Sequence, residues 1–210
     1  MLPPIEFLLA FTIAASLLTI TPGLDTALVI RIAAAENSRR AMLAGLGIAT
    51  GCLGWGVIVA AGLGALLAAS ELAYDVLRWA GALYLFYLGY KLIRSPRRDF
   101  METASVASDS GAKSWFWRGF LTNMLNPKVG VFYVSFLPQF IPTGVNVFAS
   151  SVLLAMIHAM LGIAWFVALI LATKPIAGAL RKPHVVQWLD RVTGGIFVAF
   201  GVRLLISGRN

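Results

Sequence analysis

The stretch Leu18-Thr-Ile-Thr-Pro-Gly-Leu-Asp25 decides the fold class, because it places a proline and a carboxylate inside an otherwise apolar region. A matching stretch in the second half, Leu121-Thr-Asn-Met-Leu-Asn-Pro-Lys128, contains a proline and a lysine. In lipid, an unsatisfied backbone group or an ionised side chain is strongly unfavourable unless it faces protein or a wet cavity. The two stretches therefore predict a transport site.

The composition indicates an all-α integral membrane protein. Of the 210 residues, 59% are hydrophobic and 12% are charged, and the mean hydropathy is +0.83. Soluble domains carry about 25% charged residues, whereas about 20 apolar residues suffice to cross a bilayer. We expect six transmembrane helices, over residues 5–30, 41–69, 72–93, 119–140, 147–173 and 188–207.

The basic residues predict the orientation of these spans. Thirteen of the 17 lysines and arginines fall in the first, third and fifth connections. Cytoplasmic connections are enriched in such residues, so both termini are expected outside, which requires an even number of spans. This topology and attraction to anionic membrane lipid account for the net charge of +8, which therefore implies no nucleic-acid partner.

One long connection divides the chain into two halves. Residues 95–118 are predicted to form a cytoplasmic linker between two three-helix repeats, residues 1–94 and 119–210. Three is odd, so homologous halves must be inverted relative to each other, as in many secondary transporters. The third and sixth spans support this, because Arg78-Trp-Ala-Gly81 and Arg191-Val-Thr-Gly194 share one spacing.

The prolines Pro22 and Pro127 are expected to break the first and fourth helices. A proline inside a helix removes one hydrogen bond and displaces the carbonyl four residues earlier. The carbonyls of Leu18 and Asn123 are therefore expected to be open to a ligand. A simple kink is the alternative for each proline alone, but two prolines at corresponding places, each beside a charge, favour a site.

Candidate substrate- or proton-binding groups surround these two breaks. They are Thr21, Gly23, Asp25, Asn123, Asn126 and Lys128. A central Asp or Lys costs roughly 2.5–3.5 kcal/mol in a membrane helix. Asp25 and Lys128 are therefore expected to pair with each other, to bind a solute, or to lose their charges through a shifted pKa. The amide and hydroxyl groups can hold water or ligand against exposed backbone. The alternatives are a helix cap for Asp25 and snorkelling to the interface for Lys128.

Other noticeable residues favour packing roles. Cys52 lies in an apolar run, and His158 is a lone histidine within the fifth span, where a hydrogen-bonded packing residue is commoner than a proton relay. The second span is rich in glycine between Gly45 and Gly64, which suits close approach of helices. A homodimer through such glycine-rich faces is compatible with the sequence.

Missing motifs narrow the functional class. The chain has no phosphate-binding G-x-x-x-x-G-K-[ST], no H-E-x-x-H, no G-x-S-x-G and no cysteine-rich metal site. We therefore expect no enzyme activity, no cofactor, no metal and no ATP motor. A secondary carrier remains, with a channel or an accessory, lipid-interacting membrane protein as the alternative.

The chain resembles the lysine exporter and homoserine/threonine exporter family (LysE/RhtB type) of bacterial amino-acid carriers. The resemblance rests on Thr21-Pro-Gly-Leu-Asp25, the glycine-rich second span, Ala82-Leu-Tyr-Leu-Phe-Tyr-Leu-Gly-Tyr-Lys91, Asn126-Pro-Lys128 and Phe136-Leu-Pro-Gln-Phe140. It covers essentially the whole chain. One departure is visible, because the family usually has a second proline where this chain has Leu24.

The resemblance implies proton-driven export of amino acids or close derivatives, such as homoserine, threonine or lysine, across the bacterial cytoplasmic (inner) membrane. The mechanism we expect is alternating access between the two halves, with Asp25 exchanging protons. A zwitterion would suit this site, because its amino group could meet Asp25 and its carboxylate could meet Lys128. A carrier saturates and shows counterflow, whereas a channel does neither.

Overall fold

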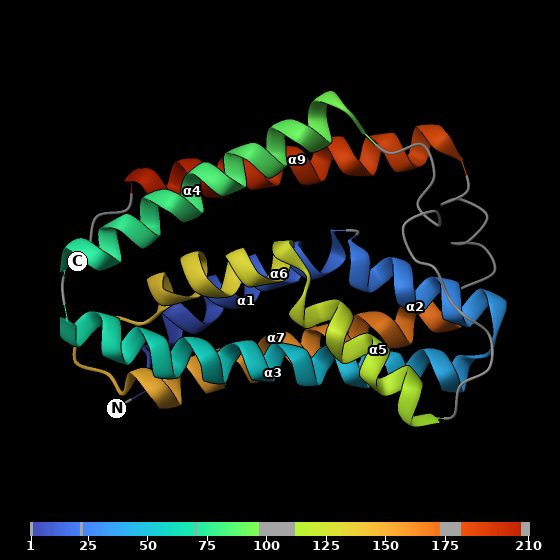
Figure 1. Ribbon diagram of the computed structural model, residues 1–210, viewed down its shortest axis with the longest axis horizontal. Helices are drawn as coiled ribbons and strands as arrows, with labels where there is room; N and C mark the ends of the chain where they lie inside the picture. Colours follow the sequence, from blue (N-terminus) through green and yellow to red (C-terminus); the bar gives the residue numbers. More distant parts are fainter. Residues whose placement is uncertain (1, 22, 70, 97–111, 173–181, 207–210) are drawn as a thin grey trace.

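The computed structural model describes residues 2–21, 23–69, 71–96, 112–172 and 182–206 (Figure 1). All regular structure within these ranges is helical, which confirms the predicted all-α class. The helices are α1 (Ile5–Ile20), α2 (Leu24–Ala35), α3 (Ser38–Ala69), α4 (Glu71–Arg94), α5 (Ala112–Met124), α6 (Pro127–Val131), α7 (Val147–Leu171) and α9 (Pro183–Ile206). After α6 the chain continues through a π-helical segment, η1 (Phe132–Phe136), and a 3-10 segment, η2 (Leu137–Phe140).

The first and fourth predicted spans are both interrupted. Between α1 and α2 the helix axis turns by 51°. The predicted helix-breaking residue Pro22 lies outside the described residues, although the helices on both sides of it are described. In the fourth span, α5 ends before Asn126 and Pro127 is the first residue of α6. Proline suits that position because the first helical N–H has no intrahelical partner.

The second break is fixed by a side-chain cap. Asn126 Oδ1 accepts a hydrogen bond from the backbone N–H of Lys128 at 3.1 Å, which satisfies one of the donors left open at a helix start. Helix α5, in contrast, begins at Ala112, inside the predicted linker. Residues 97–111 of that linker lie outside the described residues.

Two of the described helices, α3 over Ser38–Gly62 and α7, are each long and apolar enough to cross a membrane. The broken pair of α1 and α2 meets the same test when it is counted as one span. Helices α4 and α9 carry more polar side chains. The six-span count therefore stays a prediction.

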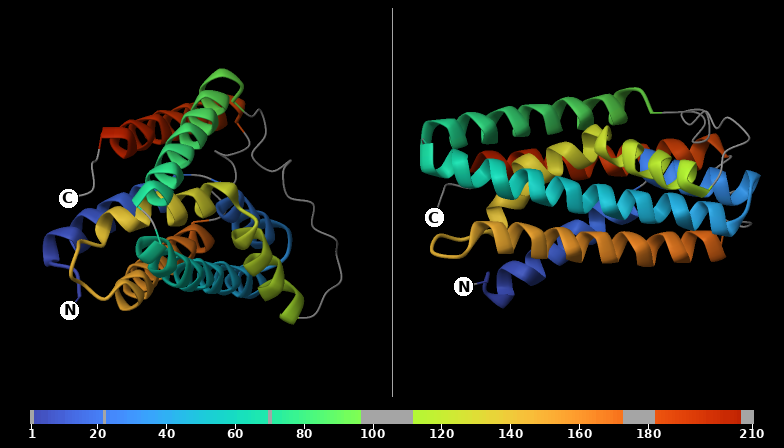
Figure 2. Two further views of the ribbon diagram at one scale, coloured as in Figure 1. Left: turned by 60° about the vertical axis from the view of Figure 1, so that its left-hand side comes forward. Right: turned by 60° about the horizontal axis from the view of Figure 1, so that its bottom comes forward.

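Close helix contacts depend on glycine. A Cβ atom added at Gly47 of α3 would lie 2.0 Å from the carbonyl oxygen of Phe116, and one at Gly119 of α5 would lie 1.9 Å from that of Ala44. These distances mean that the backbones of α3 and α5 touch without intervening side chains, as small residues allow in membrane proteins. Helix α3 also packs along α7, as Figure 2 shows.

Helices α4 and α9 form a second packed pair along one side of the molecule (Figures 1 and 2). Their contact is reciprocal, because a Cβ at Gly89 would lie 2.7 Å from the carbonyl oxygen of Gly194, and a Cβ at Gly194 would lie 2.7 Å from that of Gly89. Both helices therefore approach each other at backbone distance.

The helix ends are sorted between the two ends of the bundle. The junction of α2 with α3, the first turn of α5, the last turn of α7 and the first turn of α9 lie toward one end, and α4 runs toward that end (Figure 1). The start of α4 and the start of α7 lie at the other. The helix ends that flank the three basic connections thus lie toward one end.

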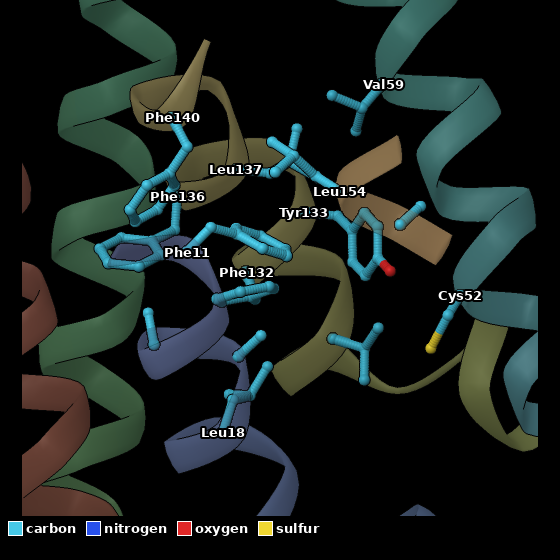
Figure 3. Packing of buried hydrophobic residues seen from close by; sticks show 14 of the residues in the cluster. Phe11, Leu18, Cys52, Val59, Phe132, Tyr133, Phe136, Leu137, Phe140 and Leu154 are labelled. Atoms are coloured by element: carbon cyan, nitrogen blue, oxygen red, sulfur yellow. The ribbon is translucent and has the colours of Figure 1, made fainter. Parts of the chain in front are cut away.

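Two apolar clusters fill the interior. The first joins α1, α3, η1, η2 and α7, and its largest members are Phe11, Phe132, Tyr133, Phe136, Leu137, Phe140 and Leu154 (Figure 3). The second joins α2, α3, α5, α7 and the start of α9, and includes Val29, Ile30, Ile32, Trp115, Phe166 and Val186. The two helix breaks lie where these clusters meet.

Candidate functional site

Asp25 is held by two asparagines from the other broken span. It lies in the first turn of α2, where a negative charge is favoured by the helix dipole. Asn123 Nδ2 donates to Asp25 Oδ2 at 2.8 Å, and Asn126 Nδ2 donates to Asp25 Oδ1 at 3.1 Å. Both asparagines are buried, with exposed fractions of 0% and 2%. The two breaks, about 100 residues apart in sequence, thus meet at one carboxylate.

Lys128 contacts the end of α1. Its Nζ atom donates to the carbonyl oxygen of Leu18 at 3.0 Å and to that of Thr21 at 2.7 Å. Leu18 is the residue whose carbonyl a proline at position 22 was predicted to displace. The ammonium also lies at the negative end of the α1 dipole, where a cation is stabilised.

The other freed carbonyl is occupied as well. The carbonyl oxygen of Asn123 accepts a hydrogen bond from Trp55 Nε1 at 3.5 Å and one from the backbone N–H of Asn126 at 3.0 Å. Both carbonyls expected to open at the breaks therefore receive a side-chain donor from another helix. The irregular backbone is satisfied inside the protein, which lipid would not allow.

A small cavity of about 40 Å³ opens between the two broken spans, α3 and α7. Asp25, Lys128, Cys52 and His158 contribute its polar lining, together with Thr19 and Thr26. Its remaining walls are apolar and come from both clusters. Such a volume holds about one to three water molecules, whereas pockets for drug-sized ligands measure about 300–1,000 Å³.

The structure places the predicted residues in different ways. Asp25 and Lys128 line the cavity, and Asn123 and Asn126 bind the Asp25 carboxylate without lining the cavity themselves. Thr21 contributes its backbone carbonyl, since its hydroxyl donates to the carbonyl oxygen of Leu17 at 2.6 Å within its own helix.

Gly23 and Pro127 contribute through the backbone. A Cβ atom at Gly23 would lie 3.1 Å from Lys128 Nζ, so the glycine leaves room for the ammonium. Pro127 starts α6, and its side chain is exposed.

Sequence reasoning overlooked three contributors on α3. Cys52 was expected to be packing only, yet its Sγ receives a hydrogen bond from Asn123 Nδ2 at 3.5 Å. Trp55 braces the carbonyl of Asn123, and Gly51 leaves the space that the side chain of Asn123 fills. An indole N–H within an apolar span needs a partner, and this was the available signal for Trp55.

His158 also faces the site. Its Nδ1 atom lies 3.1 Å from the hydroxyl of Tyr133, and its ring packs against Phe132 and Tyr133 with centroid distances of 5.4 and 5.6 Å. Figure 3 shows Tyr133 beside Phe132, with its hydroxyl turned toward the side of the cluster that holds Cys52. In the described part of the chain, no group of three His, Cys, Asp or Glu side chains could hold a metal ion.

Residues 16–208 match the model of the LysE type translocator family. The chain belongs to this family. Its members are transporters and not enzymes. No solved structure matches this LysE-type translocator.

Three relatives cover nearly its full length. An uncharacterized membrane protein of Bacillus subtilis, YrhP, is 31% identical over 95% of this chain and 99% of its own. The threonine efflux protein of Escherichia coli K12 is 29% identical over 89% and 91%, respectively. The homoserine/homoserine lactone efflux protein of Salmonella typhimurium is 28% identical over 98% of both chains.

The substitution Gly51→Ala tests how Asn123 is positioned. A Cβ at Gly51 would lie 2.6 Å from Asn123 Oδ1 and 2.9 Å from its Cβ, so the asparagine must shift, which disturbs its hydrogen bond to Asp25. A hydrogen bond to a charged group contributes about 1.5–3 kcal/mol. We therefore expect substrate binding to weaken roughly 10-fold or more, measured by isothermal titration of the purified protein at a temperature at which circular dichroism shows the variant to be folded.

Gly54→Ala is the matched control for this experiment. It lies almost one turn further along α3, and its Cβ would meet Met124 Sδ at an ordinary 3.4 Å. Binding by this variant should equal wild type. If both variants bind substrate as tightly as wild type does, the position of Asn123 does not matter for substrate binding.

Proposed function

We propose that this LysE-type translocator exports threonine, homoserine or close derivatives from the cytoplasm by proton-coupled alternating access. The observation that carries the proposal is that the two helix breaks meet at one carboxylate. Asn123 and Asn126 bind Asp25, and Asp25 and Lys128 line one cavity. Transporters place their binding sites at such discontinuous helices. The efflux functions named for the two enterobacterial relatives support the substrate class.

The charges of the site suit a zwitterion. The substrate amino group would bind Asp25 and the carbonyls at the end of α1, and its carboxylate would bind Lys128. Asn123 and Asn126 would hold the Asp25 carboxylate in position, and Asp25 would exchange the coupling proton. A bound amino acid adds no net charge to a site that already holds one carboxylate and one ammonium, which limits the cost of burying charge.

The packing around the cavity supports an alternating-access cycle. The first apolar cluster lies on the α1 side of the helix breaks and the second on the α2 side. Each would close one route to the site. The cavity is too small for an amino acid in this conformation, so one cluster has to separate before substrate enters.

The architecture we propose is six spans in two inverted repeats, residues 1–94 and 119–210, joined by the 95–118 linker. The broken spans correspond, α3 corresponds to α7, and α4 corresponds to α9. The reciprocal contact of Gly89 with Gly194 supports a two-fold relation. The helix ends that flank the basic connections lie toward one end of the bundle. Because basic connections favour the cytoplasm, this supports a cytoplasmic location for that end and an external location for the start of α1 and the end of α9. Anionic lipid and a second copy of the chain remain proposed partners.

Efflux from intact cells tests the function. Cells expressing the wild type and loaded with threonine or homoserine should release the amino acid faster than cells with an empty vector. The rate should saturate with internal concentration and fall to the control rate when an uncoupler removes the proton gradient. Release that equals the empty-vector rate, with the protein present in the membrane, would contradict the proposal.

A further inference from the structure

The ammonium of Lys128 already occupies a position suited to a substrate amine. It reaches two backbone carbonyls at the end of α1, at 3.0 and 2.7 Å, from Leu18 and Thr21. Leu18 and Thr21 lie at the carboxyl end of α1, where the last backbone carbonyls lack partners within the helix. The carbonyls offer partial negative charge without a formal charge, which suits any primary ammonium.

The space around this ammonium is tight. A Cβ at Gly23 would lie 3.1 Å from Nζ, and the adjoining cavity measures about 40 Å³. Room is therefore lacking for a second ammonium on the same carbonyls while Lys128 stays in place. Asp25 lies on the same cavity and is the nearby carboxylate.

We propose that Lys128 is an internal substitute for the substrate, whose ammonium fills the amine subsite in the empty carrier and is displaced when an amino acid binds. This inference rests on the proposed function. The incoming ammonium takes over the carbonyls of Leu18 and Thr21 together with Asp25. The displaced lysine then turns to the substrate carboxylate, so every charge keeps a partner and the net charge of the site stays the same.

A substitute of this kind would make the carrier selective for zwitterions. A simple amine could displace Lys128 only by leaving its ammonium buried without a carboxylate, which is unfavourable. An amino acid brings that carboxylate along. The carrier would thereby reject small amines that carry the same ammonium group.

The alternative is that Lys128 is a permanent cap of α1, which substrate never displaces. Both roles predict that propylammonium, which replaces the atoms that the substitution removes, binds Lys128→Ala and raises its stability. The two roles differ in whether the amine and the substrate can bind at the same time. A substitute shares its position with the substrate amine, so propylammonium and threonine must exclude each other, whereas a permanent cap allows both to bind together.

The experiment measures threonine and homoserine binding to purified full-length Lys128→Ala at several concentrations of propylammonium chloride, with sodium chloride at equal ionic strength as reference. At ten times its own Kd, propylammonium should raise the apparent Kd of the amino acid about tenfold, as competition for one site requires. Propylammonium alone should raise the unfolding midpoint of the variant by roughly 3–6 °C and leave wild type unchanged.

Two further proteins complete the test. Lys113→Ala, an exposed lysine of α5, is the matched control and should respond to propylammonium as wild type does. If Lys128→Ala does not fold, Lys128→Met keeps the length of the carbon chain and removes only the ammonium group, so it is tested with ammonium chloride instead.

Three results separate the possible failures. An unchanged or lower Kd for the amino acid in the presence of propylammonium, with normal wild-type transport, overturns the inference and leaves the proposed function standing. An unfolding midpoint of Lys128→Ala that does not rise with propylammonium, with normal wild-type transport, does the same. Absence of amino-acid binding and transport in wild type overturns the proposed function, and the inference falls with it.

Discussion

Replacing Asp25 by asparagine is expected to lower amino-acid efflux about 100-fold or more, with the protein still folded. The carboxylate accepts hydrogen bonds on both oxygens, from Asn123 and Asn126. An amide offers one acceptor and would turn an NH₂ group toward another NH₂. Hydrogen bonds to charged groups contribute about 1.5–3 kcal/mol each, and a loss of about 3 kcal/mol corresponds to roughly 100-fold.

Initial efflux rates from loaded cells, normalised to the amount of protein in the membrane, measure this effect. Glu6→Gln is the control, because Glu6 is an exposed carboxylate at the start of the same broken span and should transport as wild type does. Efflux by Asp25→Asn at the wild-type rate, with the same dependence on pH, would remove both the binding role and the proton role of Asp25.

The second large effect is expected for stability. Gly119→Ala would place a methyl group 1.9 Å from the carbonyl oxygen of Ala44, and the obstacle is backbone that cannot rotate away. The helices α3 and α5 must separate, and overpacking of this kind costs about 1–3 kcal/mol or more. In a protein of this size that cost lowers the unfolding midpoint by roughly 2–12 °C, with lower yield of purified protein.

Gly62→Ala provides the comparison within α3. A Cβ at this position meets no atom within 4 Å, and alanine favours helix by about 1 kcal/mol over glycine. The midpoint of this variant, measured in the same detergent by differential scanning fluorimetry, should equal or exceed that of wild type. A Gly119→Ala protein as stable as Gly62→Ala would show that α3 and α5 do not touch at backbone distance.

The sequence was sufficient for the helix breaks and the groups around them. Proline geometry alone predicted that the carbonyls of Leu18 and Asn123 would be open to a ligand. In the structure they accept hydrogen bonds from Lys128 and Trp55 instead. Asp25 and Lys128 were predicted as site residues because a charge within a membrane span is unfavourable unless it has a partner. The structure places both charges on one cavity, where asparagines and backbone carbonyls are among their partners.

Other contacts could not be predicted from one sequence. Hydrophobic periodicity carries no information in a helix that is apolar on every face, so the sequence could not show which face of α3 contacts the site. Gly51 and Cys52 therefore looked like the other small residues of that helix. The hydroxyl of Thr21 looked available for ligand, but a threonine in a helix commonly bonds the carbonyl four residues earlier, as it does here.

Counterflow in proteoliposomes tests the central claim most directly, because it needs only the purified protein and a substrate. Vesicles loaded with unlabelled threonine or homoserine are diluted into a trace of the same labelled amino acid. A carrier with a site exposed alternately to each side accumulates the label transiently above its equilibrium level, and the rate saturates; this is the result that we predict for wild type. Entry of label that ignores the internal amino acid and rises linearly with concentration would identify a channel and contradict the account.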